Sequence, residues 1–346
     1  MDGDARVSKR KRNPQLDCVF LYEGGDVAEG MKSEITRVRI GPQVKDIPWG
    51  TFQGCRHLAE VHFDEGTNLL TIGDNAFSGC LALRQVTIPT SVTKLDTYAF
   101  SDCGNLASVQ FSEGLEIIGE RAFNRCTELR SVTVPSSVTE VGYGAFTDCT
   151  NLTEVILLGG ERLLNQGFLD CGFLGGERVL NKKKLSEMIG NGNSLRDCPA
   201  TNAFRGCPLT TLKISIPRAL FERVERLPGE CRLSIEQRVH DLRRLELTQD
   251  GNILACFPLI RGPSAWNIIE DTNEETAESL HQVIRLISFH ELKESSIVIE
   301  LAMWKSSLVE DRARADSRTS VPDPAKSLIM DYCGFTGFLE PAIEGA

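Results

Sequence analysis

Cysteine is the residue type in this sequence whose chemistry and spacing stand out most. The chain of 346 residues contains 12 cysteines, and some of them recur at a nearly constant interval. The recurring ones are Cys55, Cys80, Cys103, Cys126 and Cys149. Thiols can hold a metal, form disulfides or act as nucleophiles. The sequence contains no CxxC pair, so a structural zinc site is not expected.

The regular interval favours a packing role for these thiols. In a stacked array, equivalent positions lie about 4.8 Å apart with parallel Cβ directions, whereas a disulfide needs Cβ atoms roughly 3.5 to 4.5 Å apart. Buried thiols behave as small hydrophobic side chains. We therefore predict that Cys80, Cys103, Cys126 and Cys149 are free, buried and slow to react.

The five histidines show no pattern typical of an active site. They are His57, His62, His240, His281 and His290. None stands near a Ser/Asp or Cys/Asp arrangement typical of an activated nucleophile. His281 and His290 are nine positions apart, which is too far for an i, i+4 metal pair. We predict no catalytic residues, no metal and no cofactor, and the alternative is an enzyme activity in the C-terminal region.

The cysteines belong to a longer repeating unit. A phenylalanine precedes each of them by three residues, at an interval of 25 residues and then of 23. These phenylalanines are Phe52, Phe77, Phe100, Phe123 and Phe146. A period of about 20 to 29 residues is typical of leucine-rich repeats. Within one unit, Val86 and Ile88 alternate with polar residues, which predicts a strand with one buried face.

The unit also resembles a known family. From Val86 to Leu106 it reads Val-Thr-Ile-Pro-x-Ser-Val-Thr-x-Leu-x-x-x-Ala-Phe-x-x-Cys-x-x-Leu, which resembles the BspA-type leucine-rich repeat over residues 36 to about 217. Residues 254–259 and 290–296 look like the C-terminal part of uncharacterised repeat proteins from photosynthetic protists. The resemblance implies a solenoid without catalytic residues. Members with signal peptides act as surface adhesins.

We predict an α+β fold: a leucine-rich-repeat solenoid with a parallel sheet on its concave face and a helical C-terminal domain. Residues 1–15 are expected to form a disordered basic tail, and residues 16–35 an N-terminal cap strand. The solenoid should span residues 36–217 with about seven repeats, including units at Phe168–Cys171 and Phe204–Cys207. The stretch from Gly172 to Asn193 is either an insertion or a degenerate repeat.

Residues 218–346 are predicted to form a helical domain that caps the last repeat. Short charged helices are expected at 218–228 and 234–247. A capping box at Thr272 predicts the start of an amphipathic helix, residues 294–304 a second helix, and residues 323–332 a third helical segment that begins at a proline.

The outward positions of the predicted strands offer a binding surface. One row contains Arg37, Glu60, Gln85, Ser108, Ser131, Glu154 and Thr211, and the other contains Arg39, His62, Thr87, Gln110, Thr133, Ile156 and Lys213. The predicted partner-binding residues are Arg37, Arg39, Glu60, His62, Gln85, Thr87, Gln110 and Glu154. The predicted function is a non-catalytic module that binds another protein along the concave face. The alternatives are the C-terminal enzyme and a structural spacer or adhesin-like protein.

Charge and hydropathy bear on the partner and the compartment. The formal charge is −10, and because the first twelve residues are net basic, the remaining chain carries −13. Such a surface repels phosphate, so nucleic acid is not an expected partner. No apolar stretch is long enough for a signal peptide or a membrane span, which predicts a cytoplasmic protein without membrane contact. The run Lys9–Arg12 is a candidate nuclear import signal.

Overall fold

The computed structural model describes residues 19–64, 66–160, 163–164, 179–181, 183–185, 203–216, 218–249, 251–261, 267–268 and 274–310. The predicted tail at 1–15, the run Lys9–Arg12, the unit at 168–171 and the helix at 323–332 lie outside these residues. The chain divides into two compact units. The first contains residues 1–165, 178–215 and 256–273, and the second contains residues 166–177, 216–255 and 274–346.

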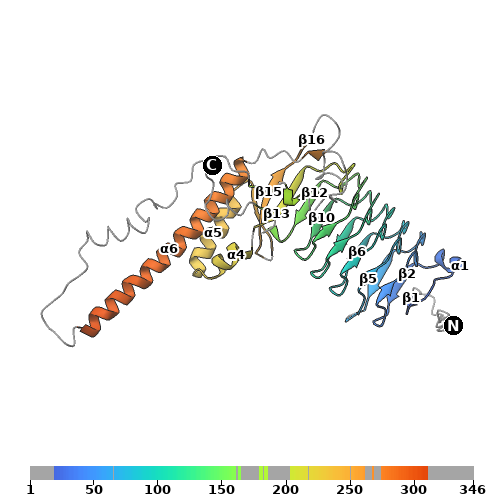
Figure 1. The fold of residues 1–346 in the computed structure, drawn as a ribbon, viewed down its shortest axis with the longest axis horizontal. Coiled ribbons are helices and arrows are strands. Elements are labelled where there is room, and N and C mark those ends of the chain that lie inside the picture. The colour runs from blue at the N-terminus through green and yellow to red at the C-terminus, as the bar shows by residue number, and fades with distance from the viewer. Residues whose placement is uncertain are drawn as a thin grey trace. The chain divides into compact units, whose positions relative to one another are not determined.

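The first unit is a solenoid of parallel strands (Figure 1). Its longer strands are β1 (Val19–Tyr22), β2 (Arg37–Ile40), β4 (Glu60–Phe63), β6 (Gln85–Thr87), β8 (Ser108–Gln110), β10 (Ser131–Val134), β12 (Glu154–Leu157) and β13 (Thr211–Ser215). They pair in three groups, β1-β2-β4, β6-β8 and β10-β12-β13. We call these strands together the first face of the solenoid.

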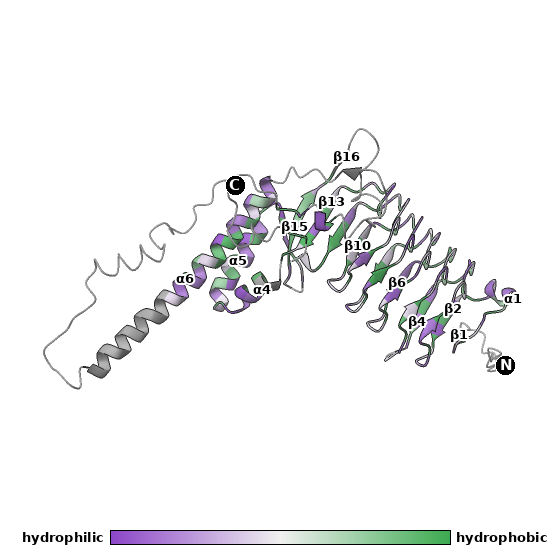
Figure 2. Cartoon of the chain, viewed as in Figure 1, coloured by the Kyte–Doolittle hydropathy of each residue, from purple (hydrophilic) through white to green (hydrophobic). Residues whose placement is uncertain are grey.

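A second row of strands forms one uninterrupted parallel sheet. It contains β3 (Asp46–Ile47), β5 (Thr71–Ile72), β7 (Lys94–Leu95), β9 (Ile117–Ile118) and β11 (Glu140–Val141). Each of these strands has only two residues, of which the second is buried. On both faces polar and apolar residues alternate along the strands (Figure 2), because one side of each strand packs into the core and the other meets solvent.

A column of phenylalanine rings fills the core between the two faces. The rings of Phe52, Phe77, Phe100, Phe123, Phe146 and Phe204 stack with centroids 5.1 to 5.4 Å apart and interplanar angles of 3° to 11°. Backbone hydrogen bonds also join the phenylalanine-containing turns of successive repeats. For example, the Phe100 N–H donates to the Ala122 carbonyl at 2.7 Å. Each unit therefore rests on its neighbours, as expected for a repeat array.

The described stack passes directly from the repeat of Phe146 to the repeat of Phe204. Phe204 stacks directly on Phe146 at 5.1 Å, and β13 pairs directly with β12, with Thr211 opposite Glu154. Two rings in van der Waals contact leave no space for a further repeat between them. The unit at Phe168–Cys171 lies outside the described residues, as do most of residues 172–193, so both the unit and the choice between an insertion and a degenerate repeat stay predictions.

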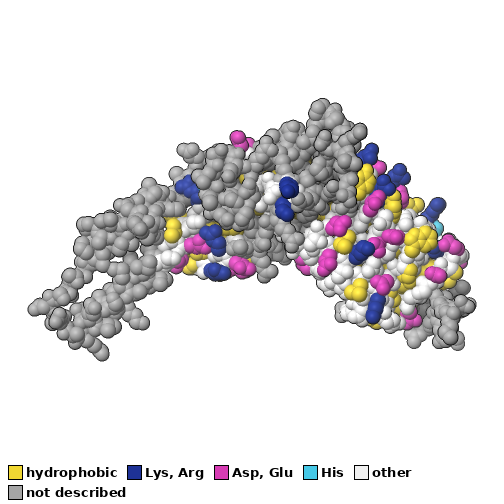
Figure 3. Space-filling view, viewed as in Figure 1, with side chains coloured by type: hydrophobic (Ala, Val, Ile, Leu, Met, Phe, Trp, Pro, Cys, Tyr) yellow, Lys and Arg dark blue, Asp and Glu magenta, His cyan; other side chains and the backbone are white. Residues whose placement is uncertain are grey.

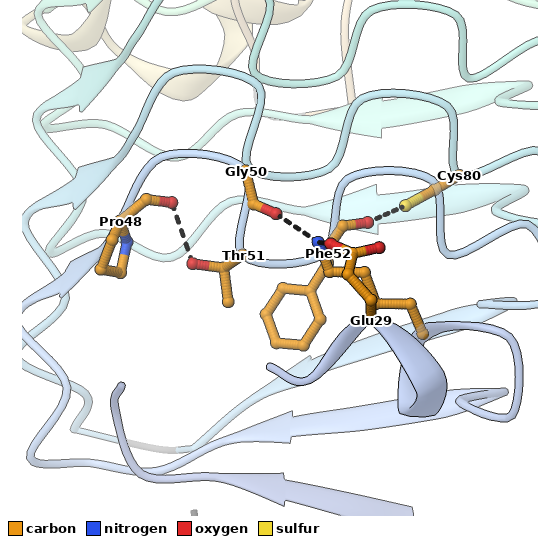
Figure 4. A network of polar contacts seen from close by, with 7 residues as sticks. Glu29, Pro48, Gly50, Thr51, Phe52 and Cys80 are labelled. Carbon is orange, nitrogen blue, oxygen red and sulfur yellow. Dashed lines mark hydrogen bonds and ion pairs between the residues drawn. The ribbon is translucent and has the colours of Figure 1, made fainter. Parts of the chain in front are cut away.

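The N-terminal end of the core is closed by more than the predicted strand. Tyr22 of β1 meets Phe52 edge-on, with centroids 5.2 Å apart. The short helix α1 (Glu29–Lys32) follows, and Lys32 Nζ donates to the Gly50 carbonyl at 3.1 Å and contacts Glu29 at 2.7 Å (Figure 4). The hydrogen bond to Gly50 links this helix to the first repeat, whereas the ion pair lies within the helix. The strand matches the prediction from the sequence, whereas the helix was not predicted.

The second unit is mainly helical. Its helices are α4 (Arg218–Glu225), α5 (Gly229–Asp241) and α6 (Glu274–Glu310), and α6 packs against α4, α5 and strand β14 (Leu245–Leu247). Buried Ile235, Val239 and Ile287 form part of its core. Arg223 of α4 donates two hydrogen bonds to the Glu291 carboxylate of α6, at 2.8 and 2.6 Å. Two nitrogens of one guanidinium thus bind both oxygens of one carboxylate, and this bidentate ion pair links α4 to α6.

Two expectations for this region are wrong. The helices predicted to begin at Thr272 and Glu294 are one helix of 37 residues, within which the Ser295 hydroxyl donates to the Glu291 carbonyl at 2.8 Å. The helix predicted at 234–247 ends at Asp241. Strands β14 and β15 (Ile253–Pro258) follow as an antiparallel pair, and Cys256–Pro258 of β15 belong to the first unit. There Ile260–Arg261 (β16) and Asn267–Ile268 (β17) form a small hairpin. The capping role of residues 218–346 stays a prediction.

Candidate binding surface

The predicted binding residues lie in two rows on the first face. Paired strands set these rows in register, with Arg37 opposite Glu60, Arg39 opposite His62 and Thr87 opposite Gln110. The alternating inward residues, such as Val38 and Val132, are buried. All eight predicted residues are exposed or partly exposed. The rows themselves match the sequence analysis, whereas their role in binding stays a prediction.

The N-terminal end of this surface is charged but internally paired. Arg37 Nε and His62 Nε2 each lie 3.1 Å from Glu60 Oε2. The Arg39 guanidinium donates to the Asp64 carboxylate, and this hydrogen bond raises the pKa of Arg39. Exposed ion pairs of this kind contribute little to stability. They do leave the local charge close to balanced.

Asp64 is a member of this charged group that the sequence analysis missed. It stands one position after the end of β4, outside the alternation that identified the outward rows. Its side chain is 18% exposed, against 58% for Arg39. A search limited to strand positions could not find it, because the contact comes from a loop residue that reaches back to the neighbouring strand.

The middle of the surface carries no charge in its two rows. Its outward residues are Gln85, Thr87, Ser108, Gln110, Ser131 and Thr133. The Thr87 hydroxyl donates to the Gln110 side-chain carbonyl at 3.1 Å. Hydroxyls and amides can both donate and accept hydrogen bonds. This part of the surface is therefore suited to a partner that presents peptide groups or neutral polar side chains.

The C-terminal end of the rows is again charged. Lys213 Nζ lies 2.6 Å from Glu154 Oε2, and the two side chains are 13% and 30% exposed. These residues are less accessible than the predicted outward rows imply. In the view of Figure 3, acidic and basic side chains are interspersed over the repeats, and no large area of one sign is seen.

The cysteines stabilise the turns that hold these strands. Five of the thiols, those of Cys80, Cys103, Cys126, Cys149 and Cys207, donate to the carbonyl of the phenylalanine one repeat earlier in the stack, as Cys103 does to Phe77 at 3.1 Å and Cys149 to Phe123 at 3.1 Å. The cysteines of the described residues are free and buried. Burial raises the pKa of Cys55 to about 11. The Cys55 thiol therefore stays protonated at neutral pH and packs in the core of the first repeat.

We expect the native protein to resist alkylation at these positions. At neutral pH, Cys80, Cys103, Cys126 and Cys149 should remain unmodified by iodoacetamide and should all react once the chain is unfolded, because the thiolate is the nucleophile and these thiols are buried. Peptide mass spectrometry after timed labelling measures this. Rapid labelling in the native state, or a disulfide between neighbouring members, would contradict the packing role.

Within the described ranges, no group of three or more His, Cys, Asp or Glu residues could hold a metal ion. Across the same part of the chain, no helix combines the length and the apolar character that a membrane span requires. These statements concern the described residues alone.

Comparisons with known proteins agree with the repeat architecture. Residues 31–153 match the model of the BspA type leucine rich repeat region in six copies. No curated protein matches the chain.

Three similar solved structures are two bacterial leucine-rich-repeat proteins and a pneumococcal vaccine antigen. A leucine rich repeat protein of T. pallidum is 31% identical over 36% of this chain and 63% of that one, with a TM-score of 0.33. The pneumococcal vaccine antigen PcpA is 30% identical over 38% of this chain and 32% of that one, with a TM-score of 0.36. A leucine-rich repeat protein from Eubacterium ventriosum is 20% identical over 42% and 41%, with a TM-score of 0.36. The chain spans less than two thirds of each of these proteins.

Proposed function

We propose, starting from the BspA-type leucine-rich repeats of residues 31–153, that this protein is a non-catalytic module that binds another protein along the first face of its solenoid. The observation that carries the proposal is the pair of solvent-facing polar rows held at fixed positions by a continuous ring column. Stacked repeats present extended binding surfaces of this type. A rigid surface also loses little conformational entropy when a partner docks.

The distribution of charge suggests how a partner would be recognised. The uncharged centre offers hydrogen-bonding groups, as in the Thr87 to Gln110 contact, and the paired charges at the two ends surround it. Charges at the rim of an interface mainly direct association and exclude wrong partners. We therefore expect a protein partner whose central contacts are polar and whose flanks carry both signs of charge.

Charge reversal on the first face tests the proposal. A partner must first be identified by affinity purification from the native cell. Arg39→Glu should then weaken binding of this partner by about tenfold, because the substitution places a second carboxylate beside that of Asp64 and reverses the local charge. Titration by calorimetry measures the change. Charge reversal at Arg37 or Glu60 should act in the same direction.

The second face supplies a matched control. Lys94 of β7 lies 2.7 Å from Asp96 and is 44% exposed, so Lys94→Glu also places like charges together at an exposed strand position. It should leave partner affinity unchanged. Equal losses from Arg39→Glu and Lys94→Glu would exclude the first face as the binding surface. Purification that yields no partner would favour the spacer interpretation.

The compartment is part of this proposal. We expect the module to meet its partner in the cytoplasm, with Lys9–Arg12 as a candidate import signal. Imaging of the tagged chain, compared with a chain in which these basic residues are replaced, tests both expectations.

A further inference from the structure

We propose that two copies of this chain associate through strand β1, which pairs antiparallel with its own counterpart and joins the two solenoids into one continuous sheet. Strand β1 (Val19–Tyr22) pairs with β2 along one edge. In the part of the chain that the structure describes, no strand pairs with its other edge. An open edge presents unpaired backbone groups to any extended segment that can reach them.

The side chains of β1 depart from the pattern of the first face. On β2, β4, β6, β8 and β10 the two outward positions carry polar residues. On β1 the equivalent positions are Val19 and Leu21, which are 47% and 48% exposed. The strand contains no charged residue and no proline, the features that usually protect a sheet edge. A strand edge that stays in contact with water does not account for two exposed apolar side chains and the lack of a charge or proline, whereas a contact with another protein chain does.

Backbone directions show which groups are available. In a parallel pair, alternate residues direct their peptide groups to the same neighbour. The Gly41 N–H donates to the Tyr22 carbonyl at 2.8 Å, so Tyr22 and Phe20 face β2. The peptide groups of Val19 and Leu21 consequently point to the open edge. They can form a ladder with a second chain.

The register that we propose has Phe20 of both copies on the two-fold axis. Opposite residues of an antiparallel pair share a face, so the outward Val19 and Leu21 must oppose outward residues. Placing Phe20 on the two-fold axis sets Val19 against Leu21 of the other copy, and these are the residues with free peptide groups. It also covers the inward Phe20, which is only partly buried.

Symmetry and charge favour a copy over a different partner. An antiparallel self-pair is an isologous contact that closes as a dimer and leaves no further open edge of the same type. On the neighbouring strand β2, the charges of Arg37 and Arg39 are balanced by Glu60 and Asp64. The outward arginines of β2 therefore do not oppose the approach of a second copy. A contact of this size lies at the weak end of protein interfaces.

Sedimentation equilibrium of the full chain tests the dimer. The protein should change from monomer to dimer as the concentration rises through the micromolar range. Leu21→Lys and, separately, Val19→Lys should weaken the dimer by about tenfold or more, because a charge on an edge strand opposes pairing. The control Trp49→Lys, at an apolar side chain that is 70% exposed, should not. A wild type that stays monomeric, or a dimer that withstands both β1 substitutions, overturns the proposal.

Disulfide trapping tests the register independently of affinity. In a Cys18→Ser background, Phe20→Cys should crosslink two copies under mild oxidation, because this position lies on the two-fold axis with short Cβ separation. The matched variant Val19→Cys should not, since its counterpart lies two positions away. Crosslinking of both variants, or of Val19→Cys alone, contradicts the proposed pairing. Neither test depends on the partner proposed for the first face, so the two proposals can fail separately.

Discussion

Replacing Phe123 with alanine should lower the free energy of unfolding by about 3 to 5 kcal/mol, the usual cost of removing a fully buried aromatic ring. Phe123 is 0% exposed and stacks between Phe100 at 5.4 Å and Phe146 at 5.3 Å. Phe111 also meets it edge-on at 5.6 Å. The substitution therefore leaves a cavity in contact with three other rings.

Chemical denaturation followed by fluorescence or circular dichroism measures this loss. The control is Thr133→Ala, an exposed position on the neighbouring strand β10, which should change stability by less than about 0.5 kcal/mol. Because each repeat contacts only its neighbours, the cavity should also reduce the cooperativity between the two ends of the stack. A loss below about 1 kcal/mol for Phe123→Ala would contradict the ring column.

The parts of the fold that could be predicted from sequence are those fixed by spacing. The interval of the phenylalanines set the strand register, and the predicted rows place Arg37 beside Glu60 and Glu154 beside Thr211, as the structure does. The register was predictable because a strand has a side-chain period of two and each inward position repeats once per unit. A slip of one residue would expose Val38 and its equivalents.

The remaining features depend on contacts that spacing does not encode. The pairing of Arg39 with Asp64 joins a strand to a loop residue. The position of Phe204 directly on Phe146 could not be predicted, because Phe168 satisfies the same local pattern and only packing distinguishes the two. Helix α6 continues through Ser295, whose hydroxyl bonds to the Glu291 carbonyl one turn earlier and so remains compatible with a helix. In these cases the local sequence pattern is compatible with more than one structure, and only the contacts in the folded protein distinguish them.

Alkaline pH should destabilise this protein strongly through its buried thiols. A hydrogen bond with Cys103 and burial raise the pKa of Cys80, and burial raises the pKa of Cys126. A hydrogen bond with Cys207 and burial raise the pKa of Cys149. In the unfolded chain these thiols ionise near their ordinary pKa of about 9. Above that pH the unfolded state binds fewer protons than the folded state, so stability falls as the pH rises.

The size of the effect follows from the number of thiols. Each group that is protonated when folded and ionised when unfolded costs up to about 1.4 kcal/mol per pH unit. Three such groups give a slope of about 4 kcal/mol per pH unit above pH ~9.5. Burial also raises the pKa of Tyr22, which acts in the same direction. The contribution of Cys55 levels off above its own pKa of about 11, because the thiol then ionises in the folded protein too.

Denaturation midpoints measured in small steps from pH 8 to pH 10.5 test this expectation, and two variants isolate the thiols. Cys126→Ala removes one ionising group, so its slope should be shallower than that of the wild type by up to about 1.4 kcal/mol per pH unit. Leu129→Ala creates a cavity at a buried position in the same repeat. It should lower stability at every pH and leave the slope unchanged, because leucine does not ionise. If Cys126→Ala and the wild type have the same slope, Cys126 ionises as readily in the folded protein as in the unfolded chain. A thiol that ionises in this way cannot be the buried hydrogen-bond donor to the Phe100 carbonyl that the structure contains.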